Sequence, residues 1–157
     1  MNRIKFLLFI GLCTISVSVY SQKMPVGLAA ALKADDATKL GTILTDKNID
    51  DCYLDVNWQY TALAQAVRHN ARKCFDLLIE KGADVNKACS GYLPPLMHAA
   101  KYGRLDMVKV LLSKGASINY KYDGSFSPAN GETALSYAEK NNQKEVADYL
   151  RSKGAKD

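Results

Sequence analysis

PPLMHAAKYGRLDMVKVLLSKGASIN, residues 94–119, contains the pattern of two short amphipathic helices joined by a turn. Pro94 and Pro95 suit the first turn of a helix, where a missing backbone N–H loses no hydrogen bond. Gly103 suits the left-handed residue that ends such a helix. The second helix is predicted from apolar residues at helical spacing, namely Leu105, Val108, Leu111 and Leu112. Neither helix can bury its apolar side alone, so units of this kind must stack.

The same pattern occurs elsewhere in the chain at a nearly constant period. Thr61 begins a copy 33 residues before Pro94, and Thr133 begins another 39 residues after it. A weaker copy spans residues 28–44. A period near 33 residues indicates stacked supersecondary units. We therefore predict an all-α solenoid of about four helix-turn-helix repeats with projecting loops, at about residues 25–57, 58–90, 91–123 and 130–157.

These copies resemble the ankyrin repeat. The resemblance rests on Pro94-Pro95-Leu96 with Ala99-Ala100 and Gly115-Ala116, on Thr61-Ala62-Leu63 with Gly82-Ala83, and on Thr133-Ala134-Leu135 with Gly154-Ala155. It covers about residues 25–157 and implies a scaffold whose partner meets the concave side, formed by loop tips and the exposed ends of the first helices. The family's signature histidine is replaced by Ala64, Met97 and Ser136, so the hydrogen bonds of that histidine are missing.

The N-terminus has the pattern of a secretory signal. A short basic segment, residues 2–5, precedes the apolar residues 6–19, and Val19-Tyr20-Ser21 suits a signal peptidase cutting before Gln22. We expect residues 1–21 to be a signal peptide and residues 22–157 to be the folded domain, periplasmic or secreted and not inserted in a membrane. A retained membrane anchor is the alternative. Losing Arg3 and Lys5 would lower the net charge from +5 to +3.

Three cysteines remain after the expected cleavage. Cys74 lies in an apolar helical run and is predicted to be a buried small hydrophobe. Cys52 and Cys89 fall in the connections that follow two adjacent repeats, so they project from the same edge. A disulfide between Cys52 and Cys89 and a pair of free thiols are both open at this point.

A basic residue occurs in each copy near the end of the first helix. The four residues are Lys33, Arg68, Lys101 and Lys140, which we call the basic column. The next position holds His69, Tyr102 or Asn141 in the last three copies. Stacking would align the column along the concave groove and favour an acidic partner. The alternative is that these residues only make soluble helix ends.

Aromatic residues concentrate in the connections between copies and are favoured at binding anchors. Those we expect at the binding surface are Trp58, Tyr60, Tyr92, Tyr122 and Phe126. The alternative is that several of them pack beneath their own loops. The inserted stretch 120–130 is expected to be specific to this protein, since binding residues concentrate on loops held by rigid scaffolds.

The sequence favours a non-catalytic module, monomeric alone, that binds another, acidic protein as an accessory subunit or an immunity-type inhibitor. It contains no nucleophile elbow, HExxH, CxxC or Gly-rich phosphate loop, so we expect no enzyme activity, cofactor or metal. His69 is expected to face the partner or water, and His98 to be structural. An extracellular anionic polymer, a glycan or a nucleic acid, is the alternative ligand, although the modest charge makes nucleic acid a poor fit.

Overall fold

The computed structural model describes residues 22–55, 58–123 and 130–156. This part of the chain contains eight helices in four sequential pairs. The pairs are α1 (Leu28–Lys33) with α2 (Ala37–Ile43), α3 (Ala62–His69) with α4 (Arg72–Glu80), α5 (Pro95–Lys101) with α6 (Leu105–Ser113), and α7 (Ala134–Lys140) with α8 (Lys144–Ser152). The predicted signal peptide, residues 1–21, lies outside the described residues. No helix in the described ranges is long and apolar enough to span a membrane.

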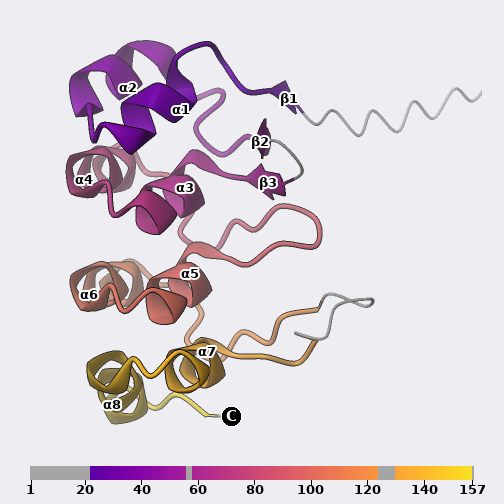
Figure 1. Cartoon of the computed structure of the whole chain (residues 1–157), viewed down its shortest axis with the longest axis vertical. Coiled ribbons are helices and arrows are strands. Elements are labelled where there is room, and N and C mark those ends of the chain that lie inside the picture. Colours follow the sequence, from indigo (N-terminus) through magenta and orange to yellow (C-terminus); the bar gives the residue numbers. More distant parts are fainter. Residues whose placement is uncertain (1–21, 56–57, 124–129, 157) are drawn as a thin grey trace, which may run out of the picture.

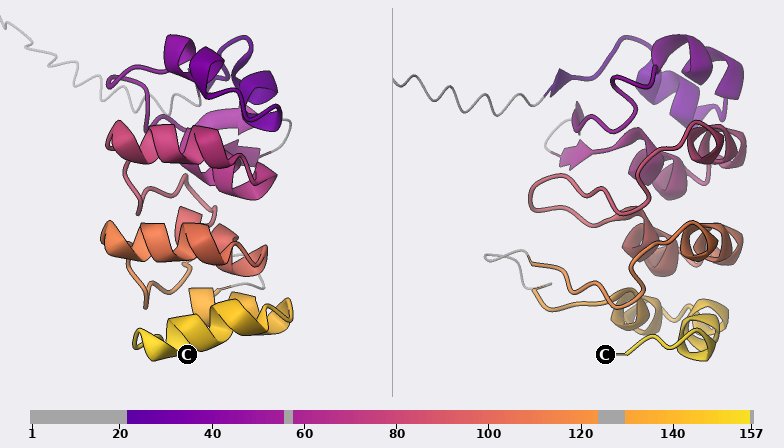
Figure 2. Two further views of the ribbon diagram at one scale, coloured as in Figure 1. Left: turned by 90° about the vertical axis from the view of Figure 1, so that its left-hand side faces the viewer. Right: turned by 180° about the vertical axis from the view of Figure 1, so that it is seen from behind.

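The helix pairs stack in one direction, as Figure 1 shows. The first helices α1, α3, α5 and α7 form one column, and each contacts the next. The second helices form a parallel column beside them, and the connections project from the side of the first helices. Figure 2 shows the same stack from two other sides. The predicted all-α solenoid of helix pairs is therefore confirmed.

Threonine or proline precedes α3, α5 and α7, whereas Gly27 precedes α1 without a side-chain cap. The Thr61 hydroxyl accepts a hydrogen bond from the backbone N–H of Ala64 at 3.2 Å. Thr133 and Ser136 bond each other's backbone N–H groups in a capping box. Pro94 is the residue before α5, and Pro95 is its first helical residue. These caps satisfy N–H groups that have no partner inside the helix.

One continuous apolar core runs through all four helix pairs. Its large fully buried side chains include Leu28 and Leu40 in the first pair, Phe75 in the second, Leu111 in the third and Leu150 in the fourth. Small residues, among them Ala66, Ala99 and Ala138, are fully buried in the first helices and let neighbouring helices approach closely. Each pair therefore depends on its neighbours for burial.

Side chains in the connections join each repeat to the next at the same position. Asp50 accepts a hydrogen bond from the backbone N–H of Asp84 at 2.9 Å. Asn86 accepts one from Ser117 at 2.8 Å, and Asn119 accepts one from Lys156 at 2.8 Å. Each donor is the residue after a Gly-Ala pair, so the bonds hold the three junctions in one register.

A small sheet forms at the N-terminal end, which the sequence did not lead us to expect. β1 (Gln22–Lys23) pairs in parallel with β2 (Tyr53–Asp55), and β2 pairs antiparallel with β3 (Trp58–Tyr60). Tyr53 is buried and donates from its hydroxyl to the backbone oxygen of Asn48 at 2.6 Å. The connection between the first two repeats is therefore held by backbone pairing and a buried ring.

Candidate functional site

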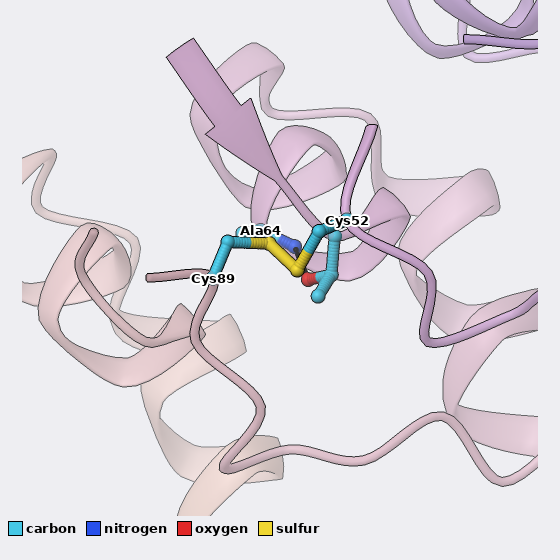
Figure 3. The surroundings of a disulfide bond; sticks show 4 residues. Cys52, Ala64 and Cys89 are labelled. Atoms are coloured by element: carbon cyan, nitrogen blue, oxygen red, sulfur yellow. Dashed lines mark hydrogen bonds between the residues drawn. A yellow bond between two sulfur atoms is a disulfide. The ribbon is translucent and has the colours of Figure 1, made fainter. Parts of the chain in front are cut away.

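Cys52 and Cys89 are joined by a disulfide, with 5.7 Å between their Cα atoms. Figure 3 shows the bond with Ala64 of α3 beside it. It links the connection that follows the first repeat to the connection that follows the second. Cys74 is free and fully buried, as predicted. Burial, together with the charge of Asp35, raises the pKa of the Cys74 thiol to about 12, so this thiol is not suited to act as a nucleophile.

The basic column lies in the last turns of the four first helices. Its last member, Lys140, is ion-paired with Glu132, whose side chain is only 13% exposed. The hydrogen bond from Lys140, together with one from Ser136, lowers the pKa of Glu132. Lys33, Arg68 and Lys101 form no ion pair with a carboxylate in the described part of the chain. The column therefore carries uncompensated positive charge in its first three repeats.

A pocket of about 330 Å³ lies at the middle of this column. It is bounded by α3, α5 and α7 on one side and by the connections that precede α5 and α7 on the other. Its lining includes Tyr60, Arg68, Tyr92, His98, Lys101, Tyr102, Tyr122 and Tyr137. We call it the His98 pocket. It draws residues from three consecutive repeats, so it exists only in the stacked array.

Two cations of the basic column lie over aromatic rings in this pocket. The Arg68 guanidinium carbon is 4.2 Å from the ring centre of Tyr60, and its Nη1 donates to Gln65 at 3.2 Å. Lys101 Nζ is 5.8 Å from the ring centre of Tyr102 and 5.9 Å from that of Tyr137. Cation–π contacts of this kind hold each charge in place without neutralising it.

His98 forms the buried side of the pocket and is only 4% exposed. Its ring is 5.4 Å from Tyr60 and 6.2 Å from Tyr102, measured between ring centres. Neither ring nitrogen has a hydrogen-bond partner within the described residues. Burial, reinforced by the positive charges of Arg68 and Lys101, lowers the pKa of His98 to about 3. His98 is therefore neutral near pH 7.

Tyr122 closes the pocket from the inserted loop. Its hydroxyl donates to the backbone oxygen of Gly91 at 2.6 Å. Its backbone N–H donates to the backbone oxygen of Glu132, and its carbonyl accepts from the backbone N–H of Gly131, both at 2.8 Å. The base of the insertion is thus tied to itself and to the preceding connection. Phe126, further along this loop, lies outside the described residues.

Several residues expected at loop tips have a different position. Tyr60 is only 6% exposed and Tyr122 only 7%, so they form walls of the pocket and do not project as anchors. The Tyr60 ring contacts Tyr92 and His98 of the next repeat, and the Tyr122 hydroxyl bonds to Gly91 of the preceding connection. Tyr92 is half-buried, with its ring centre 5.3 Å from that of Tyr60. The backbone of Trp58 lies in β3.

The remaining predicted site residues lie away from the pocket lining. Lys33 and His69 are exposed at the ends of α1 and α3. Asn141 follows α7, and its side chain donates to the backbone oxygen of Tyr137 at 2.8 Å. Arg68, Lys101 and Tyr102 lie in the groove as predicted, whereas His98, predicted to be structural, lines the pocket beside them. Its unpartnered nitrogens depend on contacts from other repeats, which no local pattern encodes.

A family model described as ankyrin repeats (3 copies) matches residues 26–122 and, in an overlapping second match, residues 87–157. The chain belongs to the ankyrin repeat family. Ankyrin repeats generally mediate protein–protein interactions, and the family is generally non-catalytic. The His98 pocket lies beside the first helices of this ankyrin array, between them and the projecting connections.

Three curated relatives share the ankyrin repeats of this chain. Ankyrin repeat and KH domain-containing protein 1 of Homo sapiens is 40% identical over 79 residues, 50% of this chain and 3% of the relative. Alpha-latrocrustotoxin-Lt1a of Latrodectus tredecimguttatus is 31% identical over 131 residues, 83% of this chain and 9% of the relative. The mask protein of Drosophila melanogaster, also named for ankyrin repeats and a KH domain, is 42% identical over 95 residues, 60% of this chain and 2% of the relative. The chain thus spans only a small part of these relatives.

Proposed function

We propose that this ankyrin protein is a non-catalytic module that binds an acidic protein in its concave groove. The observation that carries the proposal is the uncompensated charge of Arg68 and Lys101, held over tyrosine rings in a pocket between repeats. Charge complementarity steers encounter and rejects wrong partners. Tyrosine and arginine side chains are enriched among the residues that contribute most to binding energy.

The N-terminal signal pattern supports a role outside the cytoplasm, in the periplasm or beyond the cell. There, an accessory subunit of an envelope enzyme and an immunity-type inhibitor of a toxin are both natural roles for a small binding module. An inhibitor would cover the partner's active site and abolish its activity, whereas an accessory subunit would preserve it. The mass of the exported protein tests the location, because cleavage before Gln22 removes residues 1–21.

The partner is tested by affinity capture from envelope extract with protein expressed from the full chain. The charge-reversed variant Arg68→Glu/Lys101→Glu should lose the captured protein. Lys81→Glu/Lys114→Glu is the matched control, because these exposed lysines follow the second helices of the same two repeats. The captured protein is then purified, and its affinity is measured by calorimetry. If the captured protein binds both variants with equal affinity, its binding site lies outside the groove.

An extracellular anionic polymer remains the second candidate, favoured by Lys33, Arg68 and Lys101, which form no ion pair among the described residues. Binding of a polyanion falls steeply with salt because counterions are released. A protein held partly by aromatic contacts should be less sensitive. Binding of a sulfated glycan that disappears at modest salt, with no protein captured, would support the polymer in place of the protein.

A further inference from the structure

The His98 pocket contains a buried polar side chain that has no hydrogen-bond partner among the residues that the structure describes. Buried polar groups in folded proteins nearly always have partners, because a lost hydrogen bond with water is not otherwise replaced. Both nitrogens of His98 lack a partner within the described residues, although the side chain is 4% exposed and lines the pocket. A ligand group that enters the pocket would supply the missing partner.

The chemistry of that group follows from what surrounds His98. The rings of Tyr60, Tyr102 and Tyr137 already lie against the protein's own cations, and the charges of these cations repel an ammonium ligand. Arg68 and Lys101 would lose hydration without compensation against an apolar group. An anion can pair with both cations and accept the one N–H of the neutral His98 ring. A carboxylate is planar and matches the two parallel N–H groups of a guanidinium.

We propose that the His98 pocket is a subsite for one aspartate or glutamate side chain of the acidic partner. The carboxylate pairs with Arg68 and Lys101 and accepts the N–H of the His98 imidazole. This inference rests on the proposed function and specifies the partner's chemistry at the same site. The three side chains that bind the carboxylate come from the first helices of two neighbouring repeats: Arg68 from α3, and His98 and Lys101 from α5.

A single protein side chain fits the pocket better than a repeating polyanion does. The pocket is bounded by two connections, one of them tied down through Tyr122, so it receives one group and not a continuous strand. A polyanion would need free cations along the whole groove. The next cation of the basic column, Lys140, is already neutralised by Glu132.

The test uses nuclear magnetic resonance of the protein, expressed from the full chain with ¹⁵N-labelled histidine. The chain has only two histidines, so His69 provides an internal control. Hexaglutamate is the probe and hexaglutamine is its uncharged match. Hexaglutamate, added up to about 10 mM, should shift the His98 ring resonances saturably and more than those of His69. Hexaglutamine should shift neither.

Two substitutions of equal charge change separate a specific subsite from general attraction. Lys101 and Lys33 hold the same position in different repeats, but only Lys101 lines the pocket. Lys101→Gln should weaken hexaglutamate binding about tenfold, and Lys33→Gln less than about twofold. His98→Phe should weaken it comparably to Lys101→Gln. Should His98→Phe fail to fold, the two lysine variants and the resonance shifts of the unsubstituted protein still decide the question.

The proposal is overturned by any of three results. These are no saturable shift of His98, equal weakening by both lysine variants, or tighter binding of a sulfated oligosaccharide than of hexaglutamate at the same salt. Failure of the subsite is distinguishable from failure of the proposed function. A captured partner that binds Lys101→Gln and unsubstituted protein equally well would leave the binding module standing and remove only the subsite.

Discussion

Asp35 and Cys74 are joined across the first two repeats by a hydrogen bond of 2.9 Å from the backbone N–H of Cys74 to the Asp35 carboxylate. The second carboxylate oxygen accepts from the N–H of Lys73 at 3.1 Å. Helix α4 has no side-chain cap of its own, because Ala71 precedes it. Burial alone would raise the pKa of Asp35, but the backbone bonds from Cys74 and Lys73 outweigh it and the pKa is lowered. The turn of one repeat thus caps the helix of the next.

Replacing Asp35 should weaken the junction between the first two repeats. Asp35 has a φ of 52°, which glycine adopts without strain. Asp35→Gly should therefore lower the free energy of unfolding by about 1 kcal/mol, the usual contribution of a helix cap. Asp35→Ala should lower it further, because alanine resists the left-handed conformation. Urea denaturation measures both. Equal stability of Asp35→Ala and the unsubstituted protein would show that the cap contributes nothing.

His98 should make the protein less stable as the pH falls below neutrality. Its pKa is about 3 in the folded state and 6.5 without burial, so only the unfolded chain binds a proton between these values. The contribution of neutral His98 to the free energy of unfolding is complete above pH 6.5. It falls by about 1 kcal/mol for each pH unit below that value. Urea denaturation between about pH 6.5 and 4.5 measures the loss, a range above the region where Asp35 and Glu132, with their lowered pKa values, titrate.

Two histidine variants provide the comparison for this pH dependence. His98→Gln should remove it, because glutamine does not titrate. His69→Gln should retain it, because His69 is exposed. If the stability of His98→Gln falls with pH as steeply as that of the unsubstituted protein, another group causes the loss.

Reduction of the Cys52–Cys89 disulfide should destabilise the protein. The bond closes a loop across a sequence separation of 37 residues and restricts the unfolded chain. We expect reduction to lower the free energy of unfolding by about 2–4 kcal/mol. The double variant Cys52→Ser/Cys89→Ser should be no less stable with a reducing agent than without it. Alkylation of the oxidised, denatured chain should modify Cys74 alone among Cys52, Cys74 and Cys89; modification of all three would show that the bond does not form.

Leu111 and Leu112 should differ in their contribution although they are neighbours in one apolar run. Leu111 is fully buried, whereas Leu112 is only partly buried. Leu111→Ala should cost about 2–5 kcal/mol, because it removes buried atoms and leaves a cavity. Leu112→Ala should cost about 1 kcal/mol. Thermal unfolding of the two variants side by side measures the difference.

The features that sequence could predict are those that recur within one repeat. Pro95, Gly103 and the spacing of Leu111 mark helix ends and buried faces locally, so the stack could be derived from pattern alone. The site depends on pairs that no repeat contains. The ring of Tyr60 meets that of His98 from the preceding repeat, and Lys101 lies over Tyr137 of the following repeat. Contacts of this kind follow from how the repeats stack. The position of the His98 ring between Tyr60 and Tyr102 also follows from this stacking.

The disulfide makes the two ends of the array unequal in how they open. Repeat arrays unfold locally from an end, each unit losing the support of one neighbour. The first two repeats are covalently closed on each other, whereas among the described residues the last two are joined by packing and hydrogen bonds without a disulfide. Fraying should therefore start at α8 and advance toward the His98 pocket, whose outer wall includes Tyr137 of α7. A partner bound in this pocket would therefore contact disulfide-linked repeats on one side and, on the other side, a last repeat that can open locally.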